Sequence, residues 1–137
     1  STERVPAAAT LTAGIGIAIT NGANSISIAA TGAGFTWSDT SGTVTAVAEN
    51  GYFITAVTTS TLPASPSEGD TVKYIVDTAS ALTIQAAGTQ KIRVANTLSA
   101  ATGTTVNTQQ GDAMTLVYRT TGTTWFADSF VGAWTTA

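Results

Sequence analysis

Glu68 and Asp70 are the residues whose type and spacing come nearest to a catalytic pair. Glycoside hydrolysis uses two carboxylates about 5 to 10 Å apart, and residues two apart on a strand share a face. This pair, however, follows the Pro-rich run 63–67, where solvated carboxylates and a turn-forming Asp are expected. The chain also has no His, so its Ser and Thr hydroxyls lack their usual general base. The sequence therefore predicts that the protein is not an enzyme.

Aromatic and cationic side chains are better candidates, for binding a carbohydrate. Tyr52 follows the 49–51 turn signal and is expected at a loop tip, whereas Trp134 is expected to be either exposed or capping a neighbouring subunit. Lys91 and Arg93 share one face of a predicted strand. They either hold an anion at a subunit junction or, as we favour, keep that face soluble and discourage edge pairing. Aromatic residues inside apolar runs are expected in the core or an interface: Tyr74, Tyr118 and Trp125.

The sequence contains no group of residues that matches a known kind of metal or cofactor site. There is no Cys or His, and the remaining acidic residues are isolated from one another: Asp39, Glu49, Asp77, Asp112 and Asp128. No calcium-loop spacing occurs among them. We therefore expect neither a cofactor nor a metal site within one chain, while an ion bound on an axis by one residue from each of three chains stays open.

Charge and hydropathy exclude two further classes of partner. The net charge is −3 and the Lys and Arg residues are few and scattered, whereas nucleic-acid binding needs a clustered cationic face. No apolar run approaches the 18 or so residues of a membrane helix. No secretory signal is visible, and a start at Ser1 without Met predicts a fragment or a processed form.

Period-2 alternation of apolar residues predicts an all-β protein. Residues 1–10 are expected to be a linker, 11–33 an N-terminal β-hairpin and 34–137 a β-sandwich. In the hairpin, residues 21–24 form the turn, and five isoleucines share one face: Ile15, Ile17, Ile19, Ile26 and Ile28. Nine further strands are expected near residues 35–38, 44–48, 52–58, 71–76, 81–85, 91–94, 104–107, 113–118 and 124–131.

The predicted architecture is an antiparallel, jelly-roll-like sandwich that works as a homotrimer. No segment has helical periodicity with caps, and about ten short strands are typical of a sandwich, jelly roll or barrel. Ala supplies much of the hydrophobic content of 43%, and aromatic residues make up 7%. Because large core-forming side chains are sparse, we expect the strands to be completed by neighbouring copies.

Three groups of short patterns follow one another along nearly the whole chain, from residue 11 to about 134. They are Leu11-x-x-Gly14-x-Gly16-Ile17-x-Ile19-x-Asn21 with Ile26-x-Ile28; then Asn50-Gly51-Tyr52, Thr61-Leu62-Pro63-Ala64 and Gly69-Asp70; then Leu82-Thr83-Ile84-Gln85, Lys91-Ile92, Gly111-Asp112, Leu116-Val117 and Thr124-Trp125. In this order they resemble the trimeric β-domains at the distal ends of bacteriophage tail fibres and tail needles, to which domains of some bacterial surface adhesins are related.

The resemblance implies a homotrimeric knob of tumour-necrosis-factor-like shape on a fibrous stalk, with the Ile face of the hairpin towards the threefold axis. It implies exposure on the virion and attachment to a glycan or protein receptor on the bacterial surface, where three weak sites would add by avidity. No site residues carry over from the family. The alternatives are a structural cap or decoration protein without a ligand, and a small polysaccharide-degrading enzyme.

Overall fold

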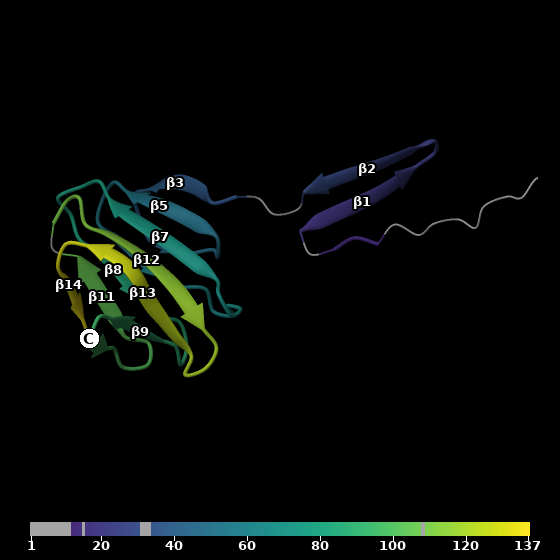
Figure 1. The fold of residues 1–137 in the computed structure, drawn as a ribbon. Helices are drawn as coiled ribbons and strands as arrows, with labels where there is room; N and C mark the ends of the chain where they lie inside the picture. Colours follow the sequence, from purple (N-terminus) through teal and green to yellow (C-terminus); the bar gives the residue numbers. More distant parts are fainter. Residues whose placement is uncertain (1–11, 15, 31–33, 108) are drawn as a thin grey trace, which may run out of the picture. The chain divides into compact units, whose positions relative to one another are not determined.

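The computed structural model describes residues 12–14, 16–30, 34–107 and 109–137. The chain divides into two compact units, Ser1–Gly34 and Phe35–Ala137. All regular elements of the described residues are strands (Figure 1), so the all-β prediction is confirmed. Among these residues no helix could cross a membrane.

The first unit contains an antiparallel hairpin of β1 (Ile17–Gly22) and β2 (Ser25–Ala30). Its turn is closed by Asn24 at φ 68°, a conformation that Asn tolerates better than most residues. Ile19 stands opposite Ile28, and strand alternation puts Ile17 and Ile26 on the same face. Ile15 lies outside the described residues.

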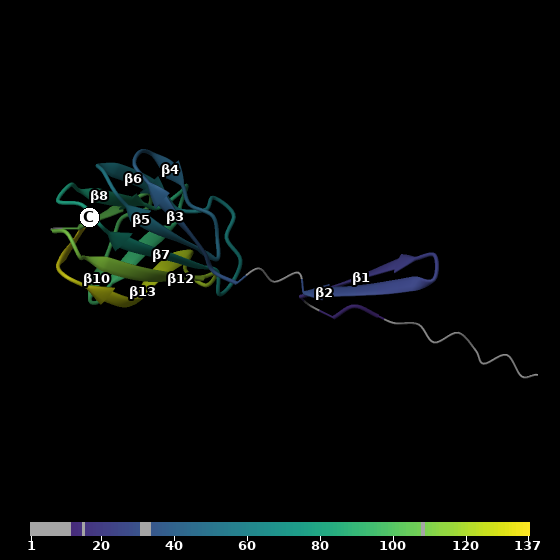
Figure 2. The ribbon, with the colours of Figure 1, turned by 90° about the horizontal axis from the view of Figure 1, so that it is seen from above.

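The second unit consists of two facing sheets (Figure 2). Their inward side chains form one core. The seven-stranded sheet has the order β10 (Thr97–Leu98), β9 (Lys91–Val94), β13 (Thr124–Val131), β12 (Ala113–Arg119), β7 (Thr71–Val76), β5 (Asn50–Ile54) and β3 (Thr36–Thr40). The five-stranded sheet has the order β14 (Trp134–Thr136), β11 (Thr104–Asn107), β8 (Leu82–Gln85), β6 (Thr58–Thr61) and β4 (Val44–Thr45).

The direction of pairing differs from the predicted antiparallel jelly roll. From β3 to β8 the chain alternates between the two sheets, so that each strand lies parallel to the next one in its own sheet. β9 is also parallel to β13. Parallel neighbours need a crossover connection, and here each crossover of this run passes through a strand of the opposite sheet. The antiparallel prediction is therefore wrong for these pairs, while a mixed β-sandwich remains.

The core of the second unit closes within a single chain. Strands such as β7 and β12 alternate between buried and half-buried residues, and the inward ones include Trp125, Ile54 and Leu116, none of which is exposed at all. The Tyr74 hydroxyl of one sheet and the Ser60 hydroxyl of the other are hydrogen-bonded at 2.8 Å, and burial raises the pKa of Tyr74. The buried core of this unit is thus formed by residues of one chain.

Candidate functional site on the outer face of the seven-stranded sheet

The outer face of the seven-stranded sheet is assembled by the pairing of its strands. Residues directly opposite each other in paired strands point to the same side of a sheet. One transverse row is therefore Trp37, Gly51, Lys73, Thr115 and Ser129. The next row is Asp39, Phe53, Ile75, Ala113 and Val131. Both rows lie on the side away from the core, because their neighbours along the strands, such as Tyr74 and Met114, are core residues.

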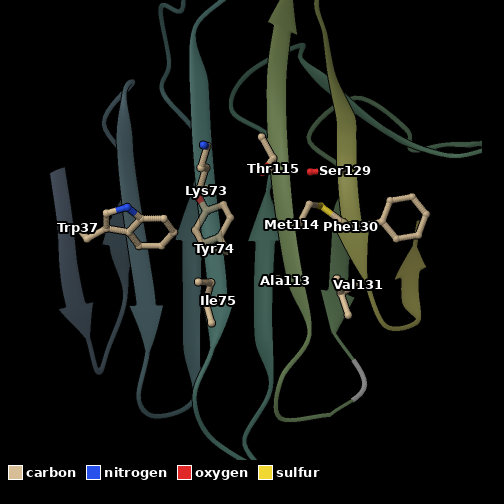
Figure 3. Close-up of a pocket in the computed structure, with 10 residues that line it drawn as sticks. All are labelled: Trp37, Lys73, Tyr74, Ile75, Ala113, Met114, Thr115, Ser129, Phe130 and Val131. Atoms are coloured by element: carbon tan, nitrogen blue, oxygen red, sulfur yellow. The ribbon is translucent and has the colours of Figure 1, made fainter. Parts of the chain in front are cut away.

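A shallow cavity of about 210 Å³ lies on this sheet (Figure 3). Its lining comes from β3, β7, β12 and β13: Trp37, Lys73, Tyr74, Ile75, Ala113, Met114, Thr115, Ser129, Phe130 and Val131. Pockets that enclose a drug-sized ligand have roughly 300–1,000 Å³. The cavity is therefore too small to enclose a drug-sized ligand.

Trp37 supplies an aromatic surface at the edge of this face. Its indole stands over Gly51, where a Cβ atom would lie 2.5 Å from two ring carbons. The ring also packs on Phe53, with 4.8 Å between centroids and 35° between planes. The side chain remains 39% exposed. Trp37 is thus held in place from one side and open to a ligand on the other.

Lys73 supplies a positive charge beside the cavity. Its Nζ lies 4.5 Å from the centroid of the Phe35 ring, a distance at which the ring quadrupole attracts a cation. Thr115 and Ser129 continue the same row and carry hydroxyls that both donate and accept hydrogen bonds. An aromatic ring, an ammonium group and two hydroxyls thus lie in one transverse row of the outer face.

Lys91 and Arg93 lie on this same outer face, at the other end of the sheet. They alternate along β9 with the buried Ile92 and Val94, as the spacing predicts. Arg93 stands opposite Phe126 of β13, which stands opposite Val117 of β12.

Tyr52 and Trp134 do not join them. Tyr52 is 4% exposed in β5, and its hydroxyl accepts a hydrogen bond from the Val47 N–H at 2.8 Å. The predicted loop-tip position is therefore wrong, because the 49–51 segment leads directly into a strand whose inward face carries Tyr52. Trp134 is half-buried against the core of its own chain, and its indole N–H donates to the Val131 carbonyl at 3.0 Å. Trp134 is expected from the sequence to be either exposed or capping a neighbouring subunit, and neither expectation includes packing against its own chain.

Glu68 and Asp70 both stabilise backbone turns. Glu68 Oε2 accepts a hydrogen bond from the Thr120 N–H at 2.6 Å, and this bond lowers the pKa of Glu68. A general acid needs the opposite shift. Asp70 Oδ2 accepts from the Ser67 N–H at 2.8 Å, as expected for a turn-forming Asp.

Sequence reasoning missed Trp37 and Lys73 as members of one site. Each stands in a strand that the sequence predicts, but their proximity depends on the parallel pairs β3–β5 and β5–β7, which period-2 alternation does not encode. Within the described ranges, no three acidic side chains are grouped closely enough to hold a metal ion. Neither the family models nor the curated proteins compared with the chain match it.

Proposed function

We propose that the protein is the homotrimeric tip of a bacteriophage tail fibre or tail needle, exposed on the virion, and that it attaches to a receptor on the bacterial surface. The observation that carries the proposal is the uncovered Ile face of the hairpin. Ile17, Ile26 and Ile28 are 40%, 62% and 62% exposed. Covering an Ile side chain stabilises by about 1.5–3 kcal/mol, and a two-stranded hairpin alone is marginal in water.

Identical copies are the occupants that this face fits best. The sequence carries no charged side chain from residue 5 to residue 38, so copies of the hairpin meet without like-charge repulsion. On its opposite face the hairpin presents small residues such as Thr20 and Ser27. Three copies, as the resemblance to fibre and needle tips implies, would enclose their Ile faces around a common axis.

The sandwich unit supports the attachment part of the proposal. It combines a core closed within one chain with an open, partly aromatic face on the seven-stranded sheet. A shallow site gives modest affinity by itself, and three linked copies raise the effective affinity through avidity. A structural cap without a ligand would not need this exposed combination of Trp37, Lys73 and hydroxyls.

Light scattering coupled to size exclusion tests the trimer. We expect about three times the chain mass of 13.8 kDa. The variant Ile26→Ser with Ile28→Ser should lower the mass to that of one chain, because it makes the apolar face polar. The variant Thr20→Ala with Ser27→Ala changes the opposite face and should leave the trimer intact. A folded monomer for the unmodified protein would refute the trimer.

Binding of the labelled protein to a panel of bacterial strains tests attachment. We expect the trimer to bind cells of at least one strain and the monomeric Ile variant to bind them much more weakly, because avidity is lost. An intact trimer that binds no strain would favour the structural cap instead.

A further inference from the structure

We infer that the outer face of the seven-stranded sheet binds an anionic polysaccharide, with Lys73, Arg93, Lys91 and Arg119 holding its acidic groups and Trp37 stacking on a sugar ring. The inference rests on the proposed function, since it names the receptor class that the attachment would use. It goes beyond that function because it specifies the face, the residues and the charge of the ligand.

The distribution of charge carries the inference. Arg119 stands opposite Thr124, which stands opposite Lys91. Alternation along β12 and β9 directs Arg119, Lys91 and Arg93 to the same side as Lys73. All Lys and Arg residues in the described part of the chain therefore lie on one face of one sheet, although the protein as a whole carries a net charge of −3.

The acidic residues are placed differently. Most of them lie in turns and loops between strands: Glu49, Glu68, Asp70, Asp77 and Asp112. Asp39 projects from β3 on the outer face, and Asp128 lies where the β12–β13 pairing is interrupted by a bulge. The cations consequently face the solvent over most of the sheet without an equal number of carboxylates among them.

These cations are available to a ligand. Within the described ranges, none of them forms an ion pair with an acidic side chain. Arg119 lies near enough to Glu68 to contribute to its lowered pKa, but Glu68 is already bonded to the Thr120 N–H. Lys73 is oriented by the Phe35 ring, so less conformational freedom is lost when it binds an anion.

The surroundings of the cations suit a saccharide, because hydroxyl-bearing side chains stand in the same transverse row as Lys73. Apolar residues lie among them, since Phe126 and Val117 continue the transverse row of Arg93, and the hydroxyl-bearing Thr115 stands opposite Lys73. The Trp37 ring lies over Gly51 and packs on Phe53, which leaves the other face of the indole open to a sugar ring. From β3 to β9 the sheet has five strand spacings, or roughly 24 Å, so the ligand is an extended polymer rather than a monosaccharide.

Binding to polygalacturonate tests the inference, with its fully methyl-esterified form as the neutral counterpart and phosphomannan as a phosphate-bearing probe. We expect the protein to bind at least one acidic polymer, to ignore the ester, and to bind more weakly as salt rises. Lys73→Gln and Arg93→Gln should each weaken binding about tenfold, as expected for loss of a charge-assisted hydrogen bond. Arg4→Gln changes the net charge equally and should have less than about a twofold effect.

Preference for polygalacturonate or phosphomannan would identify the acidic group as carboxylate or phosphate. The inference is overturned if neither acidic polymer binds, if the ester binds as well, if Arg4→Gln is as damaging as the face variants, or if single-stranded oligothymidylate binds more tightly. Light scattering on the same samples separates this result from the proposed function: a monomer that binds acidic polymer refutes the trimer and leaves the binding face standing.

Discussion

The indole ring of Trp37 occupies the space in which a side chain at Gly51 would stand. The two residues are directly opposite each other in the parallel pair β3–β5, and a Cβ at Gly51 would come within 2.5 Å of the ring. An aromatic residue that covers a glycine on a neighbouring strand replaces the packing that the glycine lacks. The orientation of the proposed sugar-stacking ring therefore depends on the absence of a side chain at position 51.

We expect Gly51→Ala to displace Trp37 and destabilise the sandwich. Overpacking typically costs about 1–3 kcal/mol, and the exposed ring can swing outward, so the loss should be near the lower end. Urea unfolding should report the free energy, and tryptophan fluorescence the ring movement. Gly42→Ala is the matched control, because nothing lies within 4 Å of a Cβ there. Equal effects of the two substitutions would contradict the packing argument.

Much of the strand pattern is predictable from the sequence, because one face of each strand is buried. The strands β7, β9, β11 and β13 have the expected bounds. The expected 52–58 strand is instead β5 and β6, which belong to different sheets, because the apolar alternation continues across the crossover between them. The sequence does not predict β10 and β14, because strands of two and three residues are too short to show period-2 alternation.

The candidate site is less predictable, because it depends on which strands are neighbours. Lys91 and Arg93 share a face as their spacing predicts. Lys73 and Trp37 come from strands that are not adjacent in the sheet, and the intervening Gly51 lets the indole extend towards Lys73. A glycine between apolar residues gives no indication in the sequence that a ring from another strand covers it.

We expect Gly132→Ala to be among the most destabilising glycine substitutions. Gly132 has φ +86°, and a Cβ there would collide with the carboxylate of Asp112. Asp112 is 1% exposed, and its Oδ2 accepts a hydrogen bond from the Gln109 N–H at 3.1 Å. The substitution therefore combines a left-handed backbone, at about 1–2 kcal/mol, with displacement of a buried carboxylate.

Gly122→Ala separates these two costs. Gly122 has a similar φ of +83°, but the nearest atom to its Cβ would be 3.7 Å away. We expect Gly122→Ala to show the backbone cost alone and Gly132→Ala to exceed it by about 1–3 kcal/mol in urea unfolding. Indistinguishable losses would mean that Asp112 moves aside freely.

We expect Gln90→Leu to destabilise the sandwich by about 2–4 kcal/mol, because buried polar groups lose their partners at about 1–3 kcal/mol each. Gln90 Oε1 accepts a hydrogen bond from the buried Trp125 indole N–H at 2.8 Å. Its Nε2 donates to the carbonyls of Pro63 and Ala64 at 2.9 and 3.1 Å. This side chain thus ties a core tryptophan to the loop that follows β6.

Gln109→Leu is the control for Gln90→Leu, since Gln109 is exposed. It should change the free energy of unfolding by less than about 0.5 kcal/mol. Thermal and urea unfolding give the comparison, and the Trp125 contribution to fluorescence reports whether the indole gains access to water. If both variants unfold alike, the Gln90 hydrogen bonds contribute nothing measurable.

We expect the sandwich to lose a small part of its stability in acid, when the Glu68 carboxylate becomes protonated. The Thr120 N–H holds the pKa of Glu68 below its ordinary value of 4.5. A carboxyl whose pKa is lower in the folded than in the unfolded state contributes stability above the unfolded value, and this contribution is lost as pH falls through the folded value. The melting temperature should therefore fall less between pH 6 and pH 3 in Glu68→Gln than in the unmodified protein.

Because Glu68 is fully exposed, solvent screening keeps this difference in melting temperature small. NMR titration of the Glu68 side-chain carboxyl therefore gives the sharper readout. A titration midpoint at or above 4.5 would contradict the hydrogen bond to Thr120.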